Sequence, residues 1–68
     1  DILVRTSGYI YIMELKYDRS AEEALEQIER KEYSLPWSVD SRTVIGIGIN
    51  YSSEKRRIDT WTQATLPK

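Results

Sequence analysis

The stretch from Tyr9 to Lys16 constrains the fold more than any other part of the sequence. It reads Tyr-Ile-Tyr-Ile-Met-Glu-Leu-Lys, and Glu14 is its first charged residue. A strand that borders water on one face alternates apolar and polar residues, whereas this stretch is apolar on both faces before Glu14. We therefore expect residues 9–16 to form a central strand of a sheet, with Glu14 and Lys16 at its end.

Residues 2–5 form a shorter apolar run, separated from that strand by the turn signal Thr-Ser-Gly at residues 6–8. Short connections that contain glycine commonly join antiparallel strands. We expect the two runs to pair as an antiparallel hairpin.

A helix is predicted to follow from Ser20. Ser20 and Glu23 have the spacing of a capping box, and two glutamates in the first turn suit the positive end of the helix dipole. The helix is expected to end near Glu32 or Tyr33, before Pro36. Its apolar stripe consists of Ala21, Ala24, Leu25 and Ile28.

Residues 34–41 form an irregular link, and two more strands are predicted beyond it. Residues 42–50 are rich in Val and Ile, and Gly46 and Gly48 lie on one side of this strand, where a helix can approach closely. Residues 52–57 form a charged loop, and residues 58–65 are predicted to form an edge strand. The predicted fold is therefore a small α+β (α/β) unit with a mixed sheet and one covering helix.

The size of the chain suggests a partial domain. It has 68 residues, and cores below roughly 70–80 residues usually need a disulfide, a metal or a partner subunit. No signal peptide and no apolar run of about 20 residues is visible, so we expect a cytoplasmic protein without a membrane span. We expect residues 1–68 to be one partial domain, a fragment of a larger protein.

Composition narrows the chemistry. The chain contains no Cys and no His, which excludes Ser-His and Cys-His catalytic pairs and zinc sites of the usual Cys type. A metal site would need oxygen ligands, which favours Mg²⁺ or Mn²⁺. The formal net charge is −1, so binding of nucleic acid would depend on a local basic patch.

Glu14 and Lys16 are the candidate chemical pair. Residues two apart in a strand share a face, so this carboxylate and this ammonium project side by side while Leu15 faces away. A carboxylate beside a lysine can bind a divalent cation and stabilise charge on a phosphate. The alternative is a simple ion pair at a sheet edge. Glu29 and Lys31 repeat the spacing within the helix, where the two side chains diverge.

Asp1 adds a second carboxylate. In an antiparallel hairpin the start of the first strand lies beside the end of the second, so Asp1 and Glu14 are expected to meet. Two carboxylates and a lysine on adjacent strands are suitable for a Mg²⁺ site.

With these residues the chain resembles the PD-(D/E)XK nuclease superfamily. That superfamily carries an acidic residue on one strand and a (D/E)-x-K motif on the next, followed by a helix and a further strand. Three parts of the chain resemble a bacterial family often found C-terminal to an AAA-ATPase-like region. They are residues 9–16, the helix opening at residues 20–28 and the stretch 43–57 with Trp61. The resemblance covers roughly residues 1–61 and implies a truncated restriction-endonuclease-like core without its first helix and strand.

The resemblance also implies roles for single residues. Asp1, Glu14 and the backbone carbonyl of Leu15 would bind Mg²⁺ or Mn²⁺, and Lys16 would be the catalytic lysine. Gln27 matches a glutamine found near the active site in several branches, and its position at the border of the apolar stripe allows it to reach the sheet; an ordinary surface glutamine is the alternative.

Two surfaces could bind partners. Lys55, Arg56 and Arg57 form the only basic cluster, which is either a phosphate contact for DNA or RNA or a solvated loop. The side chains of Tyr9, Tyr11, Met13 and Leu15 line one face of the central strand, and we expect a second copy of the chain to cover this face. Tyr33 is expected to pack in the interior.

The prediction is thus a divalent-metal-dependent nuclease domain that hydrolyses phosphodiester bonds and that could be inactive as a fragment. The alternative is a nuclease-like interaction or dimerisation module without catalysis.

Overall fold

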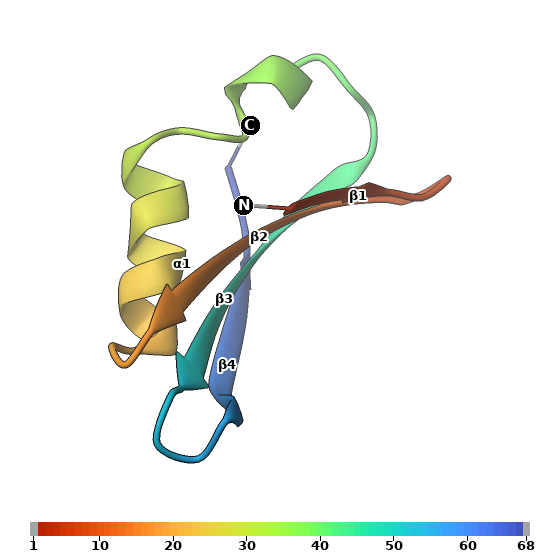
Figure 1. The fold of residues 1–68 in the computed structure, drawn as a ribbon. Helices are drawn as coiled ribbons and strands as arrows, with labels where there is room; N and C mark the ends of the chain where they lie inside the picture. Colours follow the sequence, from red (N-terminus) through yellow and green to blue (C-terminus); the bar gives the residue numbers. More distant parts are fainter. Residues whose placement is uncertain (1, 68) are drawn as a thin grey trace.

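The computed structural model describes residues 2–67. Four strands form one sheet, and a single α-helix lies against it (Figure 1). The elements, in chain order, are β1 (Ile2–Arg5), β2 (Tyr9–Tyr17), α1 (Ala21–Arg30), the short 3-10 helix η1 (Leu35–Trp37), β3 (Thr43–Ser52) and β4 (Arg57–Thr65).

The strands lie in sequence order across the sheet. The β1–β2 and β3–β4 pairs are antiparallel, and β2 runs parallel to β3. The helix lies in the connection between the parallel strands, because such a crossover needs a long link. The predicted mixed sheet, the central position of residues 9–16 and the single covering helix are confirmed. Compared with the predicted 42–50, β3 begins one residue later and ends two residues later, and β4 begins one residue before the predicted 58–65.

The first hairpin is closed by Thr6. Its backbone N–H donates to the carbonyl of Tyr9 at 2.8 Å, and its hydroxyl oxygen accepts from the Tyr9 N–H at 3.0 Å. This bonding fixes the register in which Ile2 pairs with Met13.

The helix begins as the sequence predicts. Ser20 is the N-cap, and its hydroxyl accepts from the backbone N–H of Glu23 at 3.0 Å. No helix in the described part of the chain is both long enough and apolar enough to cross a bilayer.

The helix ends earlier than predicted. The last helical residue is Arg30, and not Glu32 or Tyr33, because Glu32 adopts a left-handed conformation with φ 53°. The N–H of Tyr33 then donates to the carbonyl of Ile28 at 3.4 Å, and that of Glu32 to Glu29 at 3.2 Å. These two bonds form a Schellman motif, in which a glutamate occupies the position usually held by glycine.

The core lies between α1 and the sheet. Its buried members are Ile10, Ile12, Ile28, Val44 and Leu66. Tyr33 packs against this cluster, as predicted.

Gly48 sets how closely the helix approaches. A Cβ at this position would lie 2.2 Å from the Ala21 carbonyl oxygen and 2.6 Å from the Leu25 nitrogen. At Gly46 the nearest atoms are side-chain methyls of Leu25 and Leu66, at 3.0–3.2 Å. The expected close approach at the glycines is therefore confirmed.

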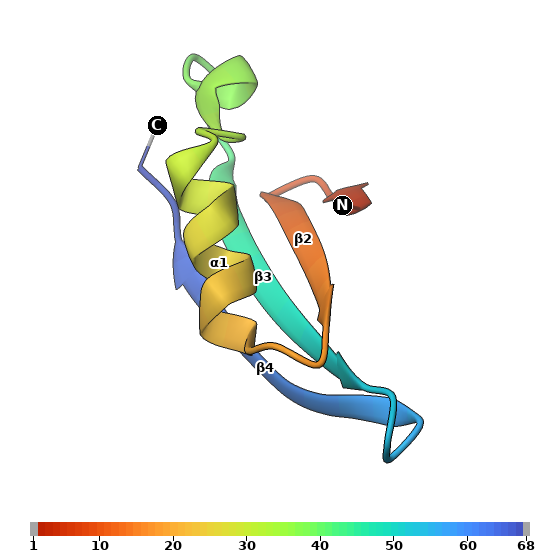
Figure 2. The ribbon, with the colours of Figure 1, turned by 60° about the vertical axis from the view of Figure 1, so that its left-hand side comes forward.

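The other side of the sheet, which we call the outer face, is open. Figure 2 shows that α1 lies on one side of β2 and β3 only. Tyr9 is 47% exposed and Trp61 63% exposed, while the isoleucines of β3 on this face are half-buried. On β2, β3 and β4, the apolar residues of the outer face are Tyr9, Tyr11, Met13, Leu15, Tyr17, Ile45, Ile47, Ile49, Tyr51, Ile58 and Trp61, placed by the register of the strands.

Candidate active site

Two charged residues of β2 point toward the helix. Along β2 the buried residues Ile10 and Ile12 lie on the helix side, and Glu14 and Lys16 continue this alternation as half-buried side chains. Leu15 lies on the outer face and is 37% exposed. The apolar strand thus delivers a carboxylate and an ammonium to the same side of the sheet.

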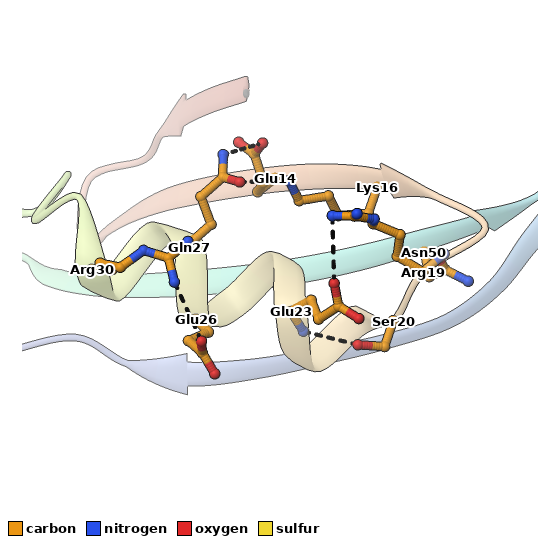
Figure 3. A network of polar contacts seen from close by, with 9 residues as sticks. All are labelled: Glu14, Lys16, Arg19, Ser20, Glu23, Glu26, Gln27, Arg30 and Asn50. Atoms are coloured by element: carbon orange, nitrogen blue, oxygen red, sulfur yellow. Dashed lines mark hydrogen bonds and ion pairs between the residues drawn. The ribbon is translucent and has the colours of Figure 1, made fainter.

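Gln27 of α1 joins this carboxylate and this ammonium. The Nζ of Lys16 donates to Oε1 of Gln27 at 2.5 Å, and Nε2 of Gln27 donates to Oε2 of Glu14 at 2.8 Å (Figure 3). All three side chains are half-buried. The helix and the strand therefore meet at one polar chain, Glu14–Gln27–Lys16, which we call the site triad.

The chemistry of the partners fixes the orientation of the Gln27 amide. An ammonium only donates hydrogen bonds and a carboxylate only accepts them, so the amide oxygen must face Lys16 and the amide nitrogen must face Glu14. Gln27 therefore holds the opposite charges apart while it satisfies both. Hydrogen bonds to charged groups are stronger than neutral ones, which favours a defined geometry for the triad.

The backbone carbonyl of Leu15 is directed toward the β1 side of β2. Thr6 and Tyr9 are directly hydrogen-bonded across the hairpin, and backbone groups of a strand alternate between its two neighbours. The backbone carbonyl of Leu15 therefore points in the same direction as that of Tyr9. The described pairing of β1 with β2 reaches Ile2 and Met13, so no described β1 residue is paired with Leu15.

These oxygens fit a hard divalent cation. Glu14 supplies a carboxylate, Leu15 supplies a carbonyl at the end of the β1–β2 pairing, and Mg²⁺ and Mn²⁺ prefer oxygen ligands. Residues 2–67 contain no cluster of three or more His, Cys, Asp or Glu side chains that could hold a metal. Asp1, the remaining ligand implied by the family resemblance, lies outside the described residues.

Asn50 is a polar neighbour that the sequence interpretation missed. It pairs with Lys16 in the β2–β3 ladder, is 5% exposed, and accepts a hydrogen bond from the backbone N–H of Arg19 at 2.9 Å. This bond ties the loop after β2 to β3. The alternation from Gly46 and Gly48 already places residue 50 on the helix side, and this signal could have identified it.

The basic cluster lies apart from the triad, in the turn between β3 and β4, which extends beyond the N-terminal end of α1 (Figure 1). Lys55 forms an exposed ion pair with Asp59 at 2.8 Å, and Arg57 begins β4 opposite Ser52. Arg56 has φ 55° within the turn.

Asp18 anchors this turn. Its carboxylate accepts hydrogen bonds from the hydroxyl and the backbone N–H of Ser53. The hydroxyl bond, and then the backbone bond, lower the pKa of Asp18 below its ordinary value. The turn that carries the basic cluster is therefore attached to the residue that follows β2.

One comparison with known proteins gives a match. A family model described as the PD-(D/E)XK nuclease superfamily matches residues 1–61, a range that contains the whole triad. Neither the curated proteins nor the solved structures yield a match. The chain belongs to the PD-(D/E)XK nuclease superfamily.

Proposed function

We propose that this chain is a divalent-metal-dependent nuclease domain that hydrolyses phosphodiester bonds of DNA or RNA. The observation that carries the proposal is the site triad, in which a carboxylate and an ammonium converge on one glutamine at the end of a central strand. Membership of a nuclease superfamily gives this arrangement its chemical context.

Glu14 and Leu15 would hold the metal through carboxylate and carbonyl oxygens, together with Asp1. Bound Mg²⁺ or Mn²⁺ supplies charge neutralisation on the phosphate and lowers the pKa of a coordinated water.

Lys16 is the proposed catalytic residue. Its ammonium would contact the scissile phosphate or the attacking water and stabilise the negative charge that develops as the bond breaks. Gln27 would keep the ammonium and the Glu14 carboxylate separate before substrate binds, so that both remain available for their roles. Gln27 is therefore a positioning residue.

Matched pairs within the chain allow a sharp test. Labelled single-stranded DNA, RNA and supercoiled plasmid would be incubated with the protein in Mg²⁺, Mn²⁺ or EDTA. We expect metal-dependent cleavage that falls by at least about 100-fold in Lys16→Ala or Glu14→Ala. Lys31→Ala and Glu29→Ala remove the same residue types from exposed positions at the C-terminal end of α1 and should leave cleavage unchanged. Cleavage by Lys16→Ala at the wild-type rate would contradict the role of Lys16.

Isothermal titration with Mn²⁺ separates this proposal from the second candidate, a nuclease-like interaction module without catalysis. We expect a binding event that disappears in Glu14→Gln and persists in Glu29→Gln. Absence of Mn²⁺ binding to the wild-type chain, together with absence of cleavage, would favour the interaction module.

The open outer face supports one further proposal, that two copies of the chain associate through it. The face carries aromatic and aliphatic side chains without charge, so a second identical face matches it chemically. Large exposed apolar patches mark association surfaces, and a C2 contact uses the same patch on both subunits. The association would leave the triad accessible, because the triad lies on the helix side.

A further inference from the structure

An apolar hollow lies on the helix side of β1 and β2, beneath η1. Figures 1 and 2 show η1 above this end of the sheet. The hollow, which we call the Trp37 hollow, is lined by Ile2, Leu3, Ile12, Tyr33, Pro36 and Trp37.

The Trp37 hollow is a direct neighbour of the site triad. Ile12 lines the hollow, and Glu14 follows it two residues later on the same side of β2. Two strand residues span about 7 Å, so a group in the hollow would lie within one nucleotide of the Glu14 carboxylate.

Two guanidinium groups lie over the Trp37 ring, with different attachments. Arg42, whose Cζ is 6.0 Å from the ring centroid, is held by Asp40 at 2.7 and 3.0 Å and by the Thr6 carbonyl at 3.2 Å. The hydrogen bonds that the Arg42 guanidinium donates to the Asp40 carboxylate raise the pKa of Arg42. Arg5, at 5.8 Å, is exposed and forms no ion pair with another described residue. Arg42 is therefore part of the scaffold, while Arg5 is an exposed cation beside the Trp37 ring.

We propose that the Trp37 hollow binds an unstacked nucleobase next to the scissile phosphate, with Trp37 as its stacking partner and Arg5 at an adjoining phosphate. The substrate class is accordingly single-stranded nucleic acid, or a duplex end that frays. This inference rests on the proposed nuclease function.

The groups at the Trp37 hollow match those of a nucleotide, which supports a nucleotide as the occupant. A base presents a flat face that stacks on an aromatic ring, and aromatic rings combined with cationic side chains are typical of single-strand binding. The phosphate carries the negative charge that an exposed guanidinium recognises. A base within a duplex is already stacked on both faces, so its entry into the hollow would require unstacking energy.

Fluorescence tests the stacking directly, because the chain has two tryptophans and Trp61 lies on the outer face. Trp61→Phe leaves Trp37 as the only indole. In EDTA, where binding is measured without hydrolysis, a short single-stranded oligonucleotide should quench this fluorescence, and the same sequence in a blunt duplex should quench it less. Unchanged fluorescence at oligonucleotide concentrations that saturate binding would overturn the proposal, as would the absence of binding.

Anisotropy of a labelled oligonucleotide tests the energetic role. Trp37→Leu, checked for folding by circular dichroism, should weaken single-strand binding about fivefold or more. Arg5→Gln should reduce the slope of log affinity against log salt by about 1, the amount expected for the loss of one phosphate contact. Arg30→Gln, on an exposed turn of α1, should leave this slope unchanged. Wild-type affinity in Trp37→Leu would overturn the proposal.

The proposed nuclease function and this inference fail in different ways. Quenching and Trp37-dependent binding without metal-dependent cleavage would support the nucleobase site and count against the nuclease. Cleavage that depends on Lys16 while Trp37→Leu binds normally would support the nuclease and overturn the nucleobase site.

Discussion

Gly48 lies directly opposite Glu14 in the parallel β2–β3 ladder. The missing side chain at Gly48 lets the backbone of α1 come so close that a Cβ would reach 2.2 Å from the Ala21 carbonyl oxygen. The amide of Gln27, six residues further along the helix, is then near enough to bond Glu14 at 2.8 Å. One glycine on β3 therefore determines whether the helix can reach the carboxylate on β2.

The first prediction concerns Gly48→Ala. The added methyl would collide with helix backbone, which cannot move aside as a side chain can, so we expect a loss of about 1–3 kcal/mol or more of unfolding free energy. Urea unfolding measures this loss. Gly46→Ala meets only side-chain methyl groups and should cost less, and Gly8→Ala, with nothing within 4 Å, should be nearly neutral. Equal stability of the Gly46 and Gly48 variants would contradict the argument.

The second prediction concerns Gln27→Ala. This change removes both hydrogen bonds of the triad and leaves a half-buried carboxylate and ammonium without their bridge. We expect a loss of about 1–3 kcal/mol of unfolding free energy, because hydrogen bonds to charged groups contribute more than neutral ones. Glu26→Ala, one position earlier on α1, removes only an exposed pair with Arg30 and should cost about 0.5 kcal/mol or less.

A double-mutant cycle between Gln27→Ala and Lys16→Met separates the stabilisation from the Lys16–Gln27 hydrogen bond from the effect of lost packing. The coupling energy should be about 0.5 kcal/mol or more if the two residues stabilise one another. Additive effects of the two substitutions would show that the hydrogen bond between them contributes nothing to stability.

The third prediction concerns acid stability. The hydrogen bonds from Ser53 lower the pKa of folded Asp18, so the folded state favours the ionised carboxylate. This contribution is fully present above the pKa of the unfolded chain, near 3.8, and is lost as the pH falls through the lower folded value. The urea midpoint should therefore fall less steeply below about pH 4 in Asp18→Asn than in the wild type.

Asp18→Asn also controls for the backbone. Asp18 has φ 53°, and asparagine tolerates this left-handed region well, so the substitution changes charge more than conformation. Ser53→Ala removes the hydroxyl that donates to Asp18, so it should also reduce the dependence of stability on acid pH. Identical pH profiles for the wild type and both variants would contradict the assignment.

The sequence predicts the elements well because local signals agree with the tertiary contacts. The apolar run at residues 9–13, the capping serine at residue 20 and the glycine spacing of β3 each have one simple structural explanation, and all three are found. The geometry of Glu14 and Lys16 on one face follows from the period of a strand.

The remaining features depend on contacts that no local pattern encodes. Leu66 follows the last strand yet is buried, because its N–H bonds the carbonyl of Val44 and its side chain reaches Gly46. The early end of α1 depends on Glu32 in a conformation that favours glycine. The bridging role of Gln27 depends on how closely the helix approaches, which only the packed structure specifies.

The last prediction concerns association through the outer face. Light scattering across micromolar concentrations should give about twice the 8.0 kDa mass of one chain. Trp61→Glu places a charge on a side chain that is 63% exposed in the single chain, so it should leave the fold intact. In the dimer the same charge would be buried without a partner, so we expect a monomer. Ser41→Glu adds the same charge at an exposed loop position and should leave the dimer intact. A wild-type chain that stays monomeric throughout this range would contradict self-association through the outer face.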